Sequence, residues 1–110
     1  MKHLKIFNMY IKENNNELIN DIILYLNSSI KTLDGCHSGN ISHKIANFRN
    51  IFGVIELMEE LEIDESVKYD MINTIKTIYS ESKRVTPLNY KFEITEFKNS
   101  LNNIIEKLKF

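Results

Sequence analysis

Residues that interrupt helices or cross-link chains are scarce in this sequence, which contains one cysteine, one proline and three glycines. A single cysteine, Cys36, excludes an internal disulfide framework and is typical of a reducing compartment. Gly35 and Gly39 lie close together and Pro87 stands alone. These positions predict two breaks between long helices rather than a chain interrupted throughout.

Charge and hydrophobic runs are equally uninformative about large partners. Fourteen Lys and Arg against fifteen Asp and Glu leave a formal net charge of −1, which disfavours nonspecific binding to nucleic acid. The longest apolar runs, residues 22–26 and 51–55, are far shorter than the roughly 20 residues that span a bilayer. Charge also interrupts the start of the chain before a signal peptide could form. We expect a single soluble, cytoplasmic domain over residues 1–110.

Apolar residues recur at helical spacing through most of the chain, whereas alternation with a period of two lasts no longer than residues 90–94. The polar run Asn14–Asn16 predicts a turn near the start. The expected helices are a short one over residues 4–11 and four longer ones over residues 17–34, 41–62, 64–85 and 95–109. This pattern predicts an all-α fold, namely an antiparallel up-down-up-down four-helix bundle with a short additional N-terminal helix that caps one end.

One histidine stands out because it lies opposite the apolar stripe of its own helix. At about 100° per residue the stripe occupies an arc of about 80°, centred nearly opposite His43. The stripe consists of Ile41, Ile45, Phe48, Phe52 and Ile55. We therefore expect His43 to face solvent. Small or modestly polar residues surround it on the helical projection, namely Ala46, Asn47, Asn50 and Gly53.

The segment Ser-His-Lys-Ile at 42–45, followed by Phe52 and Gly53 nine and ten residues after His43, resembles the signature of histidine-containing phosphotransfer (HPt) domains. In that family the histidine lies on a helix of a four-helix bundle, followed by small residues and by a glycine ten positions on. The resemblance covers the whole chain in architecture, but its specific part is confined to the residues around His43.

The resemblance implies a phosphorelay protein in which His43 accepts a phosphoryl group from one receiver-domain aspartate and donates it to another. An exposed imidazole is largely neutral, and so nucleophilic, near pH 7. The protein would need no cofactor, since Mg²⁺ would be bound by the partner receiver domain. The expected partners are a response-regulator receiver domain or a hybrid sensor kinase, with no nucleic acid and no membrane, and we expect the protein itself to be a monomer.

The residues around His43 match the family pattern only in part. Ala46 stands where the family has a lysine, and Asn47 where it has glycine or serine. Lys44 and Arg49 are then left to support the phosphate, although Arg49 projects about 120° from His43 on the helix. The remaining small residues, Ala46, Asn47, Asn50 and Gly53, would let a partner dock closely. A glycine within a helix costs about 0.5–1 kcal/mol relative to alanine, so Gly53 indicates close approach by a neighbouring helix or by the partner.

Two other classes of protein share some of these features. Sensor-kinase dimerisation domains also carry a histidine near a helix start with Asn four residues on, as at Asn47, but Lys44 replaces their general base. The chain has no room for an ATP-binding domain, so we expect no kinase activity of its own. The alternative function is a non-catalytic helical bundle that binds another protein: a kinase or receiver inhibitor, an immunity protein or a phage antagonist.

Metal chemistry has little support in the sequence. Cys36, His37 and His43 are clustered but lack the paired spacing of zinc sites, and we interpret them as turn and surface residues. The acidic residues between Glu56 and Glu65 lack the Glu-x-x-His pairs of di-iron bundles. We therefore expect no metal site.

Overall fold

The structure is a computed structural model that describes residues 4–109, and the side chains of residues 15–109. All regular structure in that range is helical, which confirms the predicted all-α class. The α-helices are α1 (Leu4–Asp34), α2 (Ile41–Phe48), α3 (Val54–Glu59), α4 (Glu65–Ser82) and α5 (Tyr90–Leu108), and a 3₁₀ segment, η1 (Arg49–Gly53), joins α2 to α3.

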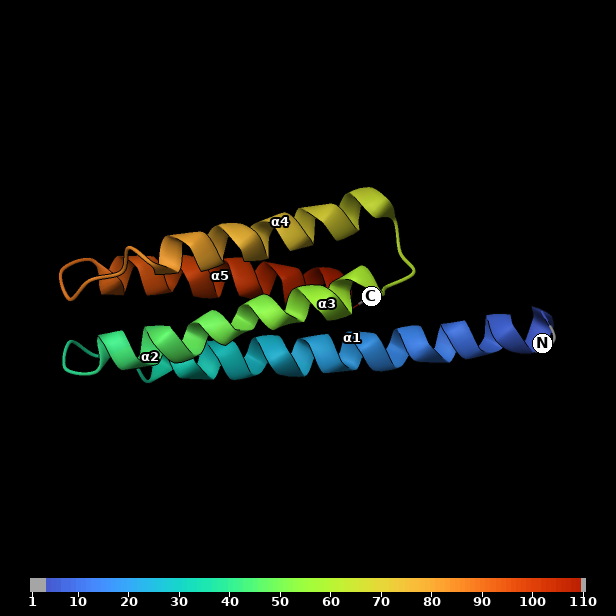
Figure 1. Ribbon diagram of the computed structural model, residues 1–110, viewed down its shortest axis with the longest axis horizontal. Coiled ribbons are helices and arrows are strands. Elements are labelled where there is room, and N and C mark those ends of the chain that lie inside the picture. Colours follow the sequence, from blue (N-terminus) through green and yellow to red (C-terminus); the bar gives the residue numbers. More distant parts are fainter. Residues whose placement is uncertain (1–3, 110) are drawn as a thin grey trace.

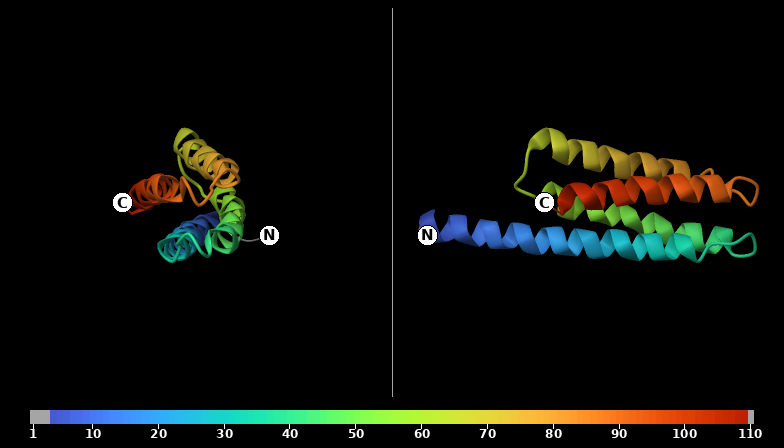
Figure 2. Two further views of the ribbon diagram at one scale, coloured as in Figure 1. Left: turned by 90° about the vertical axis from the view of Figure 1, so that its left-hand side faces the viewer. Right: turned by 180° about the vertical axis from the view of Figure 1, so that it is seen from behind.

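Because α2, η1 and α3 follow one another as a single rod, four rods lie side by side (Figure 1). Successive rods point in opposite directions along the long axis of the molecule (Figure 1). The end-on view shows α1 and α4 diagonally opposite, with the α2–α3 rod and α5 between them (Figure 2). Within residues 4–109, none of the helices combines the length and the apolar character needed to cross a bilayer.

A single long helix takes the place of the two that the sequence predicts before Gly35. Since α1 is unbroken from Leu4 to Asp34, the predicted turn at Asn14–Asn16 and the separate N-terminal helix are wrong. Asn15 uses its side chain on another segment: its Nδ2 donates to the Glu62 carbonyl oxygen (3.4 Å), and its Oδ1 accepts from the Glu62 N–H (2.9 Å). Asparagine favours turns through local hydrogen bonds, and here that preference is overridden by a tertiary contact. The first turns of α1 extend past the other rods (Figure 1).

The apolar stripes of the four rods meet in one core. At its centre the rings of Phe48 and Phe97 stack with centroids 5.6 Å apart and planes 9° from parallel. The rod that carries His43 contributes Ile41, Ile45, Phe48, Ile51, Val54, Ile55 and Met58. Because these side chains fix the inward face of the rod, the opposite face of α2 is directed to solvent.

The start of α4 is capped by the side chain of Asp64. The Asp64 carboxylate accepts hydrogen bonds from the Ser66 hydroxyl (2.6 Å) and from the N–H groups of Ser66 (2.9 Å) and Val67 (3.3 Å). The Ser66 hydroxyl above all, and then these two N–H groups, hold the pKa of the Asp64 carboxyl below its usual range. A carboxyl whose pKa is lowered by folding stabilises the folded state when ionised, and this contribution is lost as the pH falls.

Replacement of Asp64 tests whether ionisation of its carboxyl group stabilises the folded state. Asp64→Ala is expected to lower the melting temperature at pH 7 by several degrees, because two N–H groups of α4 lose their partner. The difference from the unsubstituted protein should shrink as the pH falls below about 3.9, the ordinary pKa of Asp, until only the smaller contribution of an uncharged cap remains. Asp64→Asn is the matched control, since asparagine also caps helices but does not titrate. Thermal melts followed by circular dichroism from neutral to acidic pH measure both variants, and an Asp64→Ala deficit that is unchanged in acid would contradict this account.

Candidate functional site

His43 lies in the first turn of α2, three residues after the N-cap residue Asn40. Its side chain is exposed, which confirms the exposure expected from the sequence. Within residues 15–109, no side chain forms a hydrogen bond or an ion pair with the imidazole. Both ring nitrogens are therefore accessible to a reactant from solvent.

The start of α2 is not capped by a side chain. The Asn40 amide is used within the α1–α2 loop, where its Oδ1 accepts from the His37 N–H (2.8 Å) and its Nδ2 donates to the Gly35 carbonyl (3.0 Å). It makes no side-chain hydrogen bond to α2. The first N–H groups of an α-helix have no partner within the helix, and they form the positive end of its dipole. This end lies beside His43 and favours negative charge there.

His37 is a structural residue of the same loop. Its Nδ1 accepts a hydrogen bond from the Gly39 N–H at 3.1 Å. The α4–α5 loop has the same pattern of hydrogen bonds around Asn89. The Asn89 Oδ1 accepts from the Thr86 N–H, and its Nδ2 donates to the Arg84 carbonyl oxygen, as the Asn40 amide does in the α1–α2 loop. The position of His37 is thus explained by the turn.

Cys36 is half-buried beside the same loop. Burial raises the pKa of its thiol, and the nearby Lys44 ammonium acts in the opposite direction. Among the described side chains, no group of three His, Cys, Asp or Glu residues could hold a metal ion.

The face of α2 and η1 around His43 is open. We call it the His43 face; besides His43 it comprises Ala46, Asn47, Asn50 and Gly53, and all five residues are exposed. Because η1 is a 3₁₀ helix with about three residues per turn, each residue there advances about 120° rather than about 100°. This winding brings Gly53 closer to the line of His43 than a regular α-helix would, while Asn50 stays near that line.

The prediction that Phe52 belongs to the core stripe is wrong, and the 3₁₀ winding explains why. Ile51 is fully buried, whereas Phe52 is 44% exposed. The Phe52 ring lies at the surface against Tyr79 of α4, with centroids 4.7 Å apart. A projection with α-helical winding throughout places Phe52 in the core, whereas the 3₁₀ winding turns it toward the surface.

Gly53 is explained by a neighbouring helix. A Cβ atom at Gly53 would lie 2.6 Å from the hydroxyl oxygen of Tyr25 in α1, which is closer than real contacts allow. That hydroxyl donates to the Asn50 carbonyl oxygen at 2.8 Å. The glycine therefore admits Tyr25 to the edge of the His43 face, which is one of the two explanations that the sequence left open.

The two cations expected to support a phosphate are both directed toward other elements. The Lys44 ammonium lies close to Gly35 in the α1–α2 loop: a Cβ atom added to Gly35 would be 3.4 Å from it. Arg49 is turned toward α4, where its Nε donates to the Ser82 hydroxyl at 3.4 Å.

Sequence reasoning missed two residues of this region, Tyr25 and Ser82. Ser82 is 1% exposed and donates its own proton to the Tyr79 carbonyl oxygen (2.6 Å). A signal for Ser82 does exist, since it continues the spacing of Ile75 and Ile78 and so places a hydroxyl at a core position of α4. The sequence carries no comparable signal for the contact of Tyr25 with Asn50, which joins residues 25 positions apart.

Comparison with known proteins returned no match to this chain among protein-family models, curated proteins or solved structures.

Proposed function

We propose that this protein is a phosphocarrier of the HPt type, in which His43 shuttles a phosphoryl group between receiver-domain aspartates in the cytoplasm. The observation that carries the proposal is the exposed imidazole of His43 on an open face of small residues. In this proposal the four rods form the up-down-up-down antiparallel bundle typical of the family, and the second rod presents the histidine.

Phosphoryl transfer to His43 requires only that the chain expose the imidazole ring. The lone pair of one ring nitrogen attacks the phosphorus of an aspartyl phosphate in line with the leaving carboxylate. A P–N bond forms as the P–O bond breaks, and the aspartate leaves as a carboxylate, so no proton needs to be transferred by the protein. The partner's Mg²⁺ neutralises charge on the phosphoryl oxygens. An exposed, unbonded imidazole satisfies these requirements.

Positive charge for the bound phosphate would come from the backbone rather than from a lysine at position 46. His43 lies in the first turn of α2, where the N–H groups have no side-chain cap. A helix N-terminus stabilises nearby negative charge by about 0.3–1 kcal/mol, less than a direct charge-assisted hydrogen bond to an ammonium group. Lys44 is the nearest basic residue in the sequence and could turn from the loop toward the phosphate.

The second candidate function is a helical bundle that binds a protein partner without carrying phosphate. It is favoured by the absence of a lysine at position 46 and by the orientation of Arg49 toward Ser82. An inhibitor of a kinase or receiver, an immunity protein or a phage antagonist would use a surface of the bundle and would not need a reactive imidazole.

Phosphoryl exchange with receiver domains separates the two functions. Receiver domains charged with labelled acetyl phosphate in the presence of Mg²⁺ should transfer label to the protein in an acid-labile form and should not label His43→Gln. The binding-protein alternative instead predicts that His43→Gln retains full partner binding and biological activity. Absence of acid-labile label on the unsubstituted protein, or label that survives in His43→Gln, would overturn the phosphocarrier proposal.

A further inference from the structure

The outward face of α1 carries an acid, a leucine and a base in a line. Glu17, Leu24 and Lys31 are seven residues apart and all exposed, with Leu24 67% exposed. Seven residues are almost two full turns of an α-helix. The three side chains, which we call the α1 stripe, therefore follow one line along the helix, with Leu24 at its midpoint.

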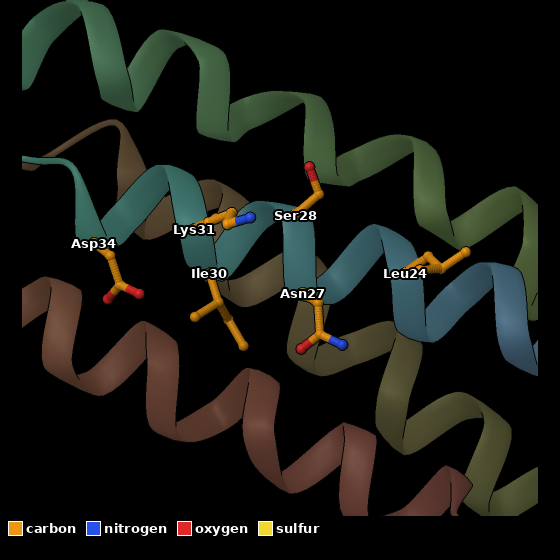
Figure 3. Close-up of a pocket in the computed structure, with 6 residues that line it drawn as sticks. All are labelled: Leu24, Asn27, Ser28, Ile30, Lys31 and Asp34. Atoms are coloured by element: carbon orange, nitrogen blue, oxygen red, sulfur yellow. The ribbon is translucent and has the colours of Figure 1, made fainter.

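The surface beside Leu24 is hollowed on both flanks. One hollow is lined by Leu24, Asn27, Ser28, Ile30, Lys31 and Asp34 of α1 (Figure 3). In this view Ser28 and Asn27 point to opposite sides of α1, and Leu24 and Lys31 follow the helix between them (Figure 3). The other hollow lies between α1 and α3 and is lined in part by Tyr25, Ser28 and Leu57. A large apolar side chain thus stands next to spaces that another leucine could enter.

We propose that the α1 stripe is the contact between two copies of this chain, packed antiparallel about a two-fold axis through Leu24. In this arrangement Leu24 meets the partner's Leu24. Glu17 lies opposite the partner's Lys31 at one end, and symmetry repeats this pair at the other end. A parallel arrangement would place Glu17 against Glu17 and Lys31 against Lys31. The order of acid, leucine and base along α1 therefore favours a second copy of the same chain, packed antiparallel rather than parallel.

Among the exposed residues that flank this line, Asn20, Asn27 and Ser28 are uncharged, whereas Asp21 carries a charge and lines the hollow between α1 and α3. In this register Asn20 and the partner's Ser28 lie at the same level but on opposite flanks of the contact, so neither places a charge against Leu24. Asp34, near the end of the same helix, already pairs with Lys98 of α5 at 2.7 Å and is therefore not left to repel a partner. A dimer of this kind departs from the monomer expected from the sequence.

The contact should be weak and reversible. One helix face buries less than the roughly 1,200–2,000 Å² of a stable interface, so the dissociation constant is expected between about 10 µM and about 1 mM. No residue of the α1 stripe belongs to the His43 face. Self-association and phosphorylation are therefore tested independently.

Sedimentation velocity of the full chain from about 10 µM to about 1 mM tests the proposal. The unsubstituted protein should shift from monomer to dimer over this range. Leu24→Ser should weaken the dimer at least tenfold, since two leucines lose their burial at once. Leu88→Ser is the matched control, because Leu88 is 98% exposed in the α4–α5 loop, and it should leave the dimer unchanged. A monomer at every concentration, or equal effects of the two substitutions, would overturn the proposal.

Charge exchange tests the direction of packing. Glu17→Lys and Lys31→Glu should each weaken the dimer roughly tenfold, because each places like charges opposite one another at both ends. The double variant Glu17→Lys/Lys31→Glu restores opposite charges and should recover most of the lost affinity. Circular dichroism checks that every variant remains folded. A double variant no stronger than either single one would rule out the antiparallel pairing.

Discussion

Phe48→Ala is expected to lower the free energy of unfolding by about 3–5 kcal/mol, the usual cost of removing a buried phenylalanine. Phe48 is 1% exposed and its ring stacks on Phe97 at the centre of the core. Urea unfolding followed by circular dichroism measures the loss.

Phe52→Ala is the matched control for that experiment. Both phenylalanines fall on the stripe that a regular α-helix would bury, but Phe52 is 44% exposed against Tyr79. Its removal should cost about 1 kcal/mol or less, because most of the lost contact is with one surface ring. Equal losses for the two substitutions would contradict the 3₁₀ winding of residues 49–53 and would restore the uniform helix that the sequence predicts.

Gly53→Ala is expected to lower the free energy of unfolding by about 0.5–1 kcal/mol, although alanine is the better helix former. The added methyl group would meet the Tyr25 hydroxyl at 2.6 Å and displace it from the Asn50 carbonyl. Loss of that hydrogen bond costs about 0.5–1.5 kcal/mol and displacement of the ring adds to it, so that together they exceed the gain of about 0.5–1 kcal/mol from helix propensity. Unfolding by urea measures the net effect.

If the Tyr25 hydroxyl is removed, Gly53→Ala should raise the free energy of unfolding instead of lowering it. In a Tyr25→Phe background the atom that clashes is gone, and the next ring atom, Cζ, lies 3.6 Å from the added Cβ. Gly53→Ala should then stabilise the protein by about 0.5–1 kcal/mol. If Gly53→Ala destabilises both backgrounds equally, Tyr25 does not explain the glycine, and approach by a partner becomes the remaining explanation.

Much of the helical pattern could be predicted because it follows from local spacing. Ile41, Ile45 and Phe48 share one face of any α-helix, so their burial and the exposure of His43 need no knowledge of the other rods. The Asp64 cap is local as well, since its partners lie within three residues. Local rules hold wherever the chain itself supplies both partners of an interaction.

The errors arose where distant segments decide the outcome. Asn15 remains helical while its side chain bonds to Glu62, 47 residues away. Ile51 replaces Phe52 in the core where the rod winds as a 3₁₀ helix against α4. No periodic pattern along one helix records such contacts, because their partners lie on other elements.

In the candidate site, too, the features set by local spacing could be predicted and those set by distant contacts could not. The five residues of the His43 face could be grouped from the sequence by angle alone, and the structure leaves all five exposed. The direction of the basic side chains could not be predicted, because Arg49 depends on Ser82 of α4 and Lys44 on the loop at Gly35. The site consequently presents an open imidazole whose nearest positive field comes from the start of α2.

Chemical phosphorylation of the isolated protein tests the central claim most directly, because it needs no partner. Phosphoramidate, a small donor that modifies histidine, should add one acid-labile, alkali-stable phosphoryl group to a His3→Gln background, in which His37 and His43 are the remaining histidines. His37→Gln is the matched control, since His37 is exposed in the adjacent loop but its Nδ1 is occupied by the Gly39 N–H. The account predicts that His37→Gln retains the label and His43→Gln loses it. A protein that takes up no label, or one whose label is lost with His37 rather than with His43, would contradict it.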